Sequence, residues 1–326
     1  TYGEYIWREK GFGRMEADMH LDADLNNYLR ESQRKQVDMI RFDYLDKEDM
    51  FDNHSYAKGG RVLHMLRYYL GDDAFYNGLK KYLNDNAFST VEIHQLRIAM
   101  EEVCGEDLNW FFNQWFLASG HPLLVIDYEY DAEKKQQIVK LEQIQDQSTT
   151  PIHRLSFYID VYENGVPKRH LVEMNSHQQD YYFDVEEKPT NVIVDAEHVL
   201  LAEIFDEKPD EWWLEQLKAP LYMDSKIALD NISEKGAIAA IQNALTHDFW
   251  GIRLLALQKA NTLENIEEIS EAIKQQANHE NNPTKVRSSA LNLLAQQENK
   301  SELTPLFESA IKEKSLLMVA SGLYGL

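Results

Sequence analysis

Apolar side chains recur every three or four residues over most of the first 119 residues, and this spacing predicts a helical segment. Helices are expected over residues 2–12, 19–29, 55–70, 74–83, 90–103 and 108–116. Gly71 and Gly105 follow two of these stretches, where glycine favours the end of a helix. Ser55 and Thr90 stand at the starts of two others and are expected to be N-caps. Residues 1–119 are therefore predicted to form one helical domain.

From Gly120 the pattern changes to alternating apolar and polar positions, which is typical of half-buried strands. The alternating or apolar stretches are residues 124–130, 138–144, 155–161, 169–174, 181–185 and 191–194. Glu163-Asn164-Gly165 lies between two of them and is a hairpin signal. About seven short strands with turns between them predict a small antiparallel β-sandwich over residues 120–205.

The helical period returns in residues 206–326, and an internal repeat appears there. Residues 248–257 match residues 282–291 at an offset of 34, which aligns Arg253 with Arg287. A repeat of this length is typical of stacked helix pairs, as in an α-solenoid of the HEAT type. The two arginines are predicted to brace successive repeats. The expected fold class is thus multidomain, mainly α with a β-sandwich.

Charge and composition narrow the possible partners. The chain has 55 acidic and 33 basic residues, a formal net charge of −22, which argues against nucleic acid or an anionic membrane as partner. No apolar run approaches the length of a membrane span. The one cysteine, Cys104, cannot form an internal disulfide and is expected to be a buried, inert thiol. The sequence does not decide the compartment.

Motifs for metal or nucleophilic chemistry are missing from the sequence. HExxH is absent, no two of the 11 histidines are three or four residues apart, and no phosphate loop or nucleophile elbow appears. No metal or cofactor site is therefore expected in this chain. His54 merits interest only because it neighbours Tyr56, whose place at a helix entrance predicts a phenol pointing into a cleft.

The motif Tyr56-x-Lys58-Gly59 opens an ordered series that resembles the M1 family of zinc aminopeptidases just downstream of their zinc site. The series continues through Leu70-Gly71, Phe75, Gly78-Leu79, Tyr82, Thr90, Met100-Glu101, Gly105-x-Asp107-Leu108, Phe111-Phe112, Gln114-Trp115 and Gly120-x-Pro122. The opening residues 2–7 resemble the stretch that directly follows the third zinc ligand in that family.

The resemblance implies that residues 1–119 are the helical second half of a thermolysin-like catalytic domain. In that family, zinc is held by HExxH and a later glutamate, all of which would precede Thr1, and the motif's glutamate acts as general base. The chain is then a piece of a longer enzyme and should be inactive alone. Tyr56 would stabilise the oxyanion as a hydrogen-bond donor. The parent protein would release N-terminal residues from peptides with a free N-terminus.

Two other interpretations remain open. The parent could be a non-catalytic M1-like homologue that acts as a binding or scaffold protein through its helical repeats. It could also be an epoxide-hydrolysing relative. An HExxH motif upstream of Thr1 would favour an enzyme, and turnover of an aminoacyl arylamide with and without a chelator would identify an aminopeptidase.

Overall fold

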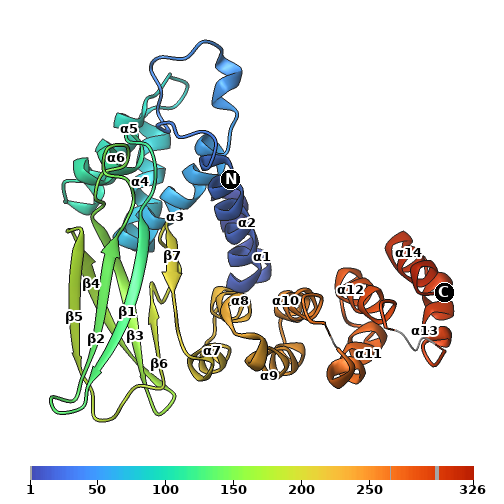
Figure 1. Ribbon diagram of the computed structural model, residues 1–326. Coiled ribbons are helices and arrows are strands. Elements are labelled where there is room, and N and C mark those ends of the chain that lie inside the picture. The colour runs from blue at the N-terminus through green and yellow to red at the C-terminus, as the bar shows by residue number, and fades with distance from the viewer. Residues whose placement is uncertain (1, 265, 298–300) are drawn as a thin grey trace. The chain divides into compact units, whose positions relative to one another are not determined.

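The computed structural model describes residues 2–264, 266–297 and 301–326. The chain divides into two compact units, residues 1–207 and 208–326 (Figure 1). Thr1, where the predicted helical domain starts, lies outside the described residues. None of the described helices is long and apolar enough to cross a lipid bilayer.

The first unit opens with helices. They are α1 (Tyr2–Phe12), α2 (Arg14–Ser32), α3 (Gly59–Leu70), α4 (Asp72–Asp85), α5 (Ile93–Cys104) and α6 (Asn109–Trp115). Two short helical turns, η1 (Lys47–Met50) and η2 (His54–Lys58), lie in the connection between α2 and α3. The predicted helices are therefore present, with bounds that differ by a few residues.

Helix α3 packs against α1, α2 and α4, and its buried face combines apolar side chains with Arg61 and His64. Val62 and Leu66 are completely buried, as the helical spacing predicts. Gly71 and Gly105 end α3 and α5 with φ of 78° and 77°, a region that suits glycine. Thr90 was expected to cap α5, but the N-cap is Glu92, since its backbone N–H bonds to Gln95 in a capping box.

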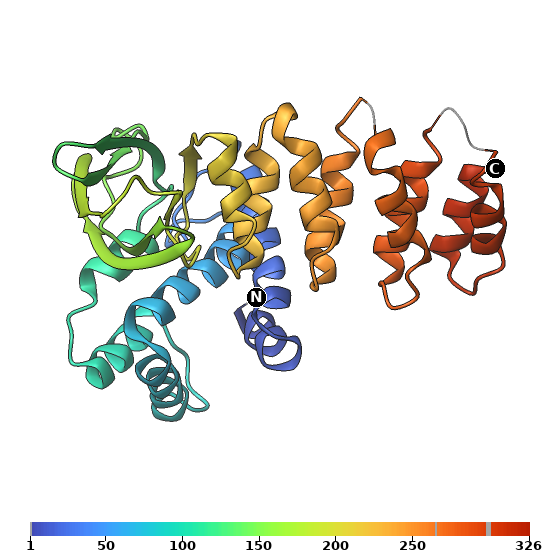
Figure 2. The same cartoon turned by 90° about the horizontal axis from the view of Figure 1, so that it is seen from below.

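The strands follow directly. They are β1 (Leu123–Asp131), β2 (Gln136–Gln143), β3 (Leu155–Glu163), β4 (Val166–Met174), β5 (Gln178–Asp184), β6 (Asn191–Val194) and β7 (Glu203–Asp206). They form two sheets, ordered β5-β2-β1-β7 and β4-β3-β6, which lie face to face in Figure 2. Phe157 and Leu141 are fully buried on these sheets. The expected hairpin is confirmed: Asn164 and Gly165 have φ of 51° and 76° between β3 and β4.

One strand corrects the expectation of a wholly antiparallel sandwich. Strand β7 pairs with β1 in parallel, from Leu123 opposite Glu203 to Ile126 opposite Asp206. The reason is topological: the chain runs through residues 195–202 after β6 and returns beside β1 in the same direction. A four-residue strand is too short to produce a clear alternation of apolar and polar positions, so β7 could not be predicted from the pattern.

Buried polar contacts attach the sandwich to the helices within the first unit. Arg14 of α2 bonds to Asp18 and to Glu197, and Glu197 also pairs with Arg169 of β4. One turn into α3, the buried Arg61 donates from Nη2 to the carbonyl oxygen of Leu200 at 2.5 Å. The segment that follows β6 is therefore fixed by cations from two helices.

The same segment carries a buried carboxylate. Asp195 is 2% exposed and accepts hydrogen bonds from the backbone N–H groups of Val199 and Leu200 at 3.1 and 2.9 Å. Burial raises its pKa to about 6, although these hydrogen bonds, Arg61 and His198 oppose the shift. We refer to Arg61, Asp195 and the backbone of residues 198–200 as the buried lock.

The second unit is helical in its described residues. It contains α7 (Asp210–Gln216), α8 (Tyr222–Asn231), α9 (Glu234–Leu245), α10 (Trp250–Ala260), η3 (Glu267–Ile269), α11 (Ser270–Asn278), α12 (Thr284–Leu294), α13 (Thr304–Ile311) and α14 (Leu316–Gly325). From α9 on, consecutive helices pack in pairs, and neighbouring pairs lie side by side (Figure 2).

The repeat predicted from the sequence corresponds to real contacts. Helix α12 begins 34 residues after α10. The guanidinium of Arg253 donates to Asn282 Oδ1 from Nε and Nη2, at 3.0 and 2.8 Å. Arg287, its equivalent, forms an ion pair with Glu313. Each arginine thus contacts a residue 29 or 26 positions further on, so each links its own helix to the next helix pair.

Candidate functional site

Tyr56 lies in η2, a single π-helical turn that continues directly into α3. The turn is closed by the backbone N–H of Lys58, which donates to the carbonyl of Asn53 at 2.8 Å. Such wide turns within helices often occur at functional sites. Ser55 is not the N-cap that the sequence suggested. The N-cap of η2 is Asn53, and the Ser55 N–H donates instead to Oδ1 of Asp52, just before it, at 2.8 Å.

The phenol of Tyr56 is directed at open space rather than at packed interior. Its side chain is 46% exposed and lines a hollow of about 490 Å³ together with Glu31, Lys35, Phe51, Asp52 and Asn53. The rings of Tyr56 and Phe51 lie 6.0 Å apart. The structure therefore places the predicted site residue where a ligand can reach it.

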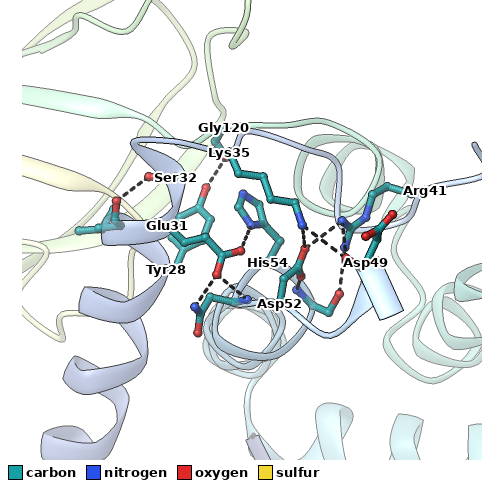
Figure 3. Close-up of polar contacts among 12 residues, drawn as sticks. Tyr28, Glu31, Ser32, Lys35, Arg41, Asp49, Asp52, His54 and Gly120 are labelled. Carbon is teal, nitrogen blue, oxygen red and sulfur yellow. Dashed lines mark hydrogen bonds and ion pairs between the residues drawn. The ribbon is translucent and has the colours of Figure 1, made fainter. Parts of the chain in front are cut away.

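A carboxylate on α2 organises the floor of this hollow (Figure 3). Glu31 Oε1 lies 3.0 Å from His54 Nδ1, and Glu31 Oε2 accepts from the side-chain and backbone N–H groups of Asn53 at 2.5 and 3.2 Å. Partial burial alone would raise the pKa of Glu31, but these hydrogen bonds outweigh it and lower the pKa. Burial lowers the pKa of His54 despite Glu31, so the neutral ring donates its Nδ1–H.

A second carboxylate is held by two cations. Asp52 Oδ2 lies 2.6 Å from Lys35 Nζ and 2.9 Å from Arg41 Nη1 (Figure 3). Desolvation works against the charged form of Asp52, but the hydrogen bonds from Arg41 and Lys35 prevail and hold its pKa well below the usual range. The charges of Glu31, Asp52, Lys35 and Arg41 sum to zero, so the hollow is polar but balanced. We call these four residues with His54 and Asn53 the hollow network.

Three members of the hollow network have the side chains of a metal site. One ligand atom each from Glu31, Asp52 and His54 lie within 4.8 Å of one another. Their donors are already engaged, however, because Glu31 holds His54 and Asn53 while Lys35 and Arg41 hold Asp52. A divalent cation would have to displace two positive side chains. These residues therefore fit an ion-paired support for η2 better than a metal centre.

Sequence reasoning identified Tyr56 and the neighbouring His54 but missed the rest of the hollow network. Glu31 is 23 residues from its partner His54, and Lys35 is 17 residues from Asp52. Such separations carry no motif. The one usable signal was Asp52, a cap-forming residue just before the helix that holds Tyr56.

Comparisons with known proteins show what the N-terminal part of the chain is similar to. Residues 1–115 match the model of the peptidase family M1 domain. The chain is 34% identical over 85 residues to probable aminopeptidase 1 of Sulfurisphaera tokodaii, a match that covers 26% of this chain and 11% of that protein. It is 34% identical over 107 residues to aminopeptidase N of Streptomyces lividans, covering 32% and 12%.

A solved structure extends the likeness in fold. The crystal structure of Legionella pneumophila aminopeptidase A in complex with aspartic acid superposes with a TM-score of 0.74 at 14% identity, covering 99% of this chain and 44% of that one. The chain thus spans less than half the length of that protein. At this identity the match concerns the fold alone. The sequence match to the peptidase family M1 domain covers residues 1–115 of the chain.

Proposed function

We propose that the chain is part of a zinc aminopeptidase that releases N-terminal residues from peptides, and that Tyr56 stabilises the oxyanion. The family match and the names of the aligned relatives support a metallopeptidase. Among the described residues, the group formed by Glu31, Asp52 and His54 does not fit a zinc site, because it is ion-paired. The proposal therefore assigns zinc to residues outside this chain and expects the chain alone to be inactive.

One observation carries the proposal: the phenol of Tyr56 is free and accessible. Within the described part of the chain its hydroxyl has no hydrogen-bond partner, and it lines the open hollow. A free hydroxyl on a rigid helix entrance can donate its hydrogen bond to a carbonyl oxygen that gains negative charge. Because that bond strengthens as the charge develops, it lowers the barrier rather than merely binding the substrate.

The proposal keeps the three-part division of the chain. Residues 1–119 are the helical part of a thermolysin-like catalytic domain, residues 120–205 a β-sandwich domain, and residues 206–326 part of an α-solenoid of the HEAT type. The last assignment is supported by the paired helices α9–α14 and by the equivalent braces of Arg253 and Arg287.

The test is Tyr56→Phe in the full-length, zinc-loaded protein, assayed on an aminoacyl arylamide. Removing one oxyanion donor costs on the order of 3 kcal/mol, so turnover should fall roughly a hundredfold. Tyr44→Phe is the matched control, since Tyr44 is a 53% exposed tyrosine in the preceding loop and should keep turnover within about twofold. Turnover of Tyr56→Phe within a few-fold of wild type, at unchanged zinc content, would contradict the assignment.

A further inference from the structure

Lys58, two residues after Tyr56, is a buried cation held by backbone carbonyls. Its side chain is completely buried, and Nζ donates to the carbonyl oxygens of Gly120 at 3.1 Å and Ala118 at 3.4 Å. The ammonium also lies 5.7 Å from the centre of the Tyr28 ring. Among the described residues no carboxylate forms an ion pair with it.

The acceptor of this lysine is a well-fixed peptide group. Gly120 has φ of 82°, and a Cβ added there would lie 2.2 Å from Thr150 Oγ1. The Gly120 carbonyl also accepts from the Tyr28 hydroxyl at 3.2 Å. This turn leads from α6 into β1, so Lys58 ties the start of α3 to the base of the sandwich.

The tie acts on the turn that carries Tyr56. Lys58 closes η2 through its backbone N–H to Asn53, and it anchors the same turn through its side chain. A π-helical turn holds one residue more than an α-helical turn. Relaxing it to α-helix would rotate the residues before it by about 100° around the helix axis. Such a rotation would turn the Tyr56 phenol away from the hollow.

We infer that Lys58 is a positioning residue: its ammonium fixes η2 to the Gly120 carbonyl and so directs the Tyr56 hydroxyl into the hollow. This inference rests on the proposed function of Tyr56. The hollow network supports the other end of the turn, where Asp52 accepts from Ser55. Tyr56 is thus held between a carboxylate on one side and a cation on the other.

The cost of this arrangement supports a role beyond packing. Burial lowers the pKa of Lys58 to about 8, and Asp38 opposes the shift only in part. An apolar side chain would fill the same space without desolvating a charge. Only a donor reaches the Gly120 and Ala118 carbonyls, which would otherwise lose a partner.

The test is a double-substitution cycle in the full-length, zinc-loaded protein, measuring kcat and KM on an aminoacyl arylamide. Lys58→Met should lower kcat about tenfold or more with little change in KM, because small misplacements of a catalytic group are costly. In a Tyr56→Phe background, Lys58→Met should change kcat by less than about twofold, since the group it positions is gone.

Arg61→Met is the matched control. Arg61 is also a buried cation on α3 that donates to backbone carbonyls, but it holds residues 198–200 and not η2. It should lower the melting temperature while the folded enzyme keeps its kcat. If Lys58→Met is poorly folded, Tyr28→Phe removes the other donor to Gly120 and should give a smaller loss of kcat, again absent without the Tyr56 hydroxyl.

Two results would overturn the inference alone. If Lys58→Met lowers kcat equally with and without the Tyr56 hydroxyl, Lys58 does not act through Tyr56. The same conclusion follows if Arg61→Met lowers kcat as much as Lys58→Met does. Wild-type turnover in Tyr56→Phe alone would instead refute the proposed function, and with it the inference. The two failures are therefore distinguishable.

Discussion

Asp52 in the hollow network and Asp195 in the buried lock both use a carboxylate to hold a backbone turn, but their surroundings differ. Asp52 is balanced by Lys35 and Arg41 at the edge of an open hollow, and its pKa is held well below the usual range. Asp195 is fully enclosed, and desolvation raises its pKa to about 6. The turn held by Asp52 is open to solvent and charge-balanced, so it can contact a ligand without exposing an unpaired charge. The turn held by Asp195 is buried and attaches the segment after β6 to the helices.

The largest expected effect comes from altering the turn at Gly120, whose carbonyl accepts the hydrogen bond from Lys58 of η2. Gly120→Ala places a methyl group against Thr150 at a backbone conformation that disfavours side chains. We expect a loss of about 3 kcal/mol in the free energy of unfolding, measured by urea denaturation.

Gly3→Ala is the control for that substitution, because nothing lies within 4 Å of the added Cβ in α1. It should leave stability unchanged or raise it by up to about 1 kcal/mol. Equal stability of the two alanine variants would show that the Gly120 turn is not a rigid anchor.

The buried lock should reveal itself through pH. The pKa of Asp195 is raised in the folded state, so its unfavourable effect is absent below the unfolded pKa near ~3.9 and develops as pH rises to about 6. Wild-type stability should therefore lose on the order of 3 kcal/mol from this group across that window. Asp195→Asn should remove this part of the pH dependence. Thermal unfolding of wild type and variant between pH 4 and pH 7 measures it. If the variant keeps the wild-type dependence of stability on pH, the Asp195 carboxyl is more exposed to solvent than the structure shows.

The smallest effect is expected at the open turn. The pKa of Asp52 is lowered, so the stability it contributes is fully present above its unfolded pKa of ~3.9 and is lost as pH falls from there through its lower folded-state pKa. Asp52→Asn keeps an acceptor for the Ser55 N–H but loses both ion pairs. It should cost about 1 kcal/mol at pH 7 and less at pH 3, measured by urea unfolding. A larger cost at pH 3 than at pH 7 would reverse the assigned direction of the shift.

Local signals in the sequence predicted the elements well. Gly71 and Gly105 marked the ends of helices, and Asn164-Gly165 marked a hairpin, because each needs a backbone conformation that few residues adopt. The 34-residue offset predicted that Arg253 and Arg287 brace neighbouring repeats, since a regular period converts sequence distance into spatial distance.

The support of the candidate site could not be predicted in the same way. Tyr56 was identified from its motif, but its turn is held from other segments, by Glu31 through His54 and by Gly120 through Lys58. Their contacts depend on how helices pack, which spacing along the chain does not encode. Ser55 is not a cap because the π-helical turn before α3 already begins at His54, which places Ser55 inside it. Cys104, expected to be buried, is only half-buried at the end of α5.

The parallel pairing of β1 with β7 has a consequence for synthesis on the ribosome. Strand β1 gains β2 on one side soon after it emerges, but its other edge waits for residues 203–206, the last strand of the unit. Until then that edge presents unpaired backbone groups that can recruit a strand from another chain. A nascent chain stalled before Glu203 is thus at its most vulnerable to aggregation, and translation through β7 closes that window.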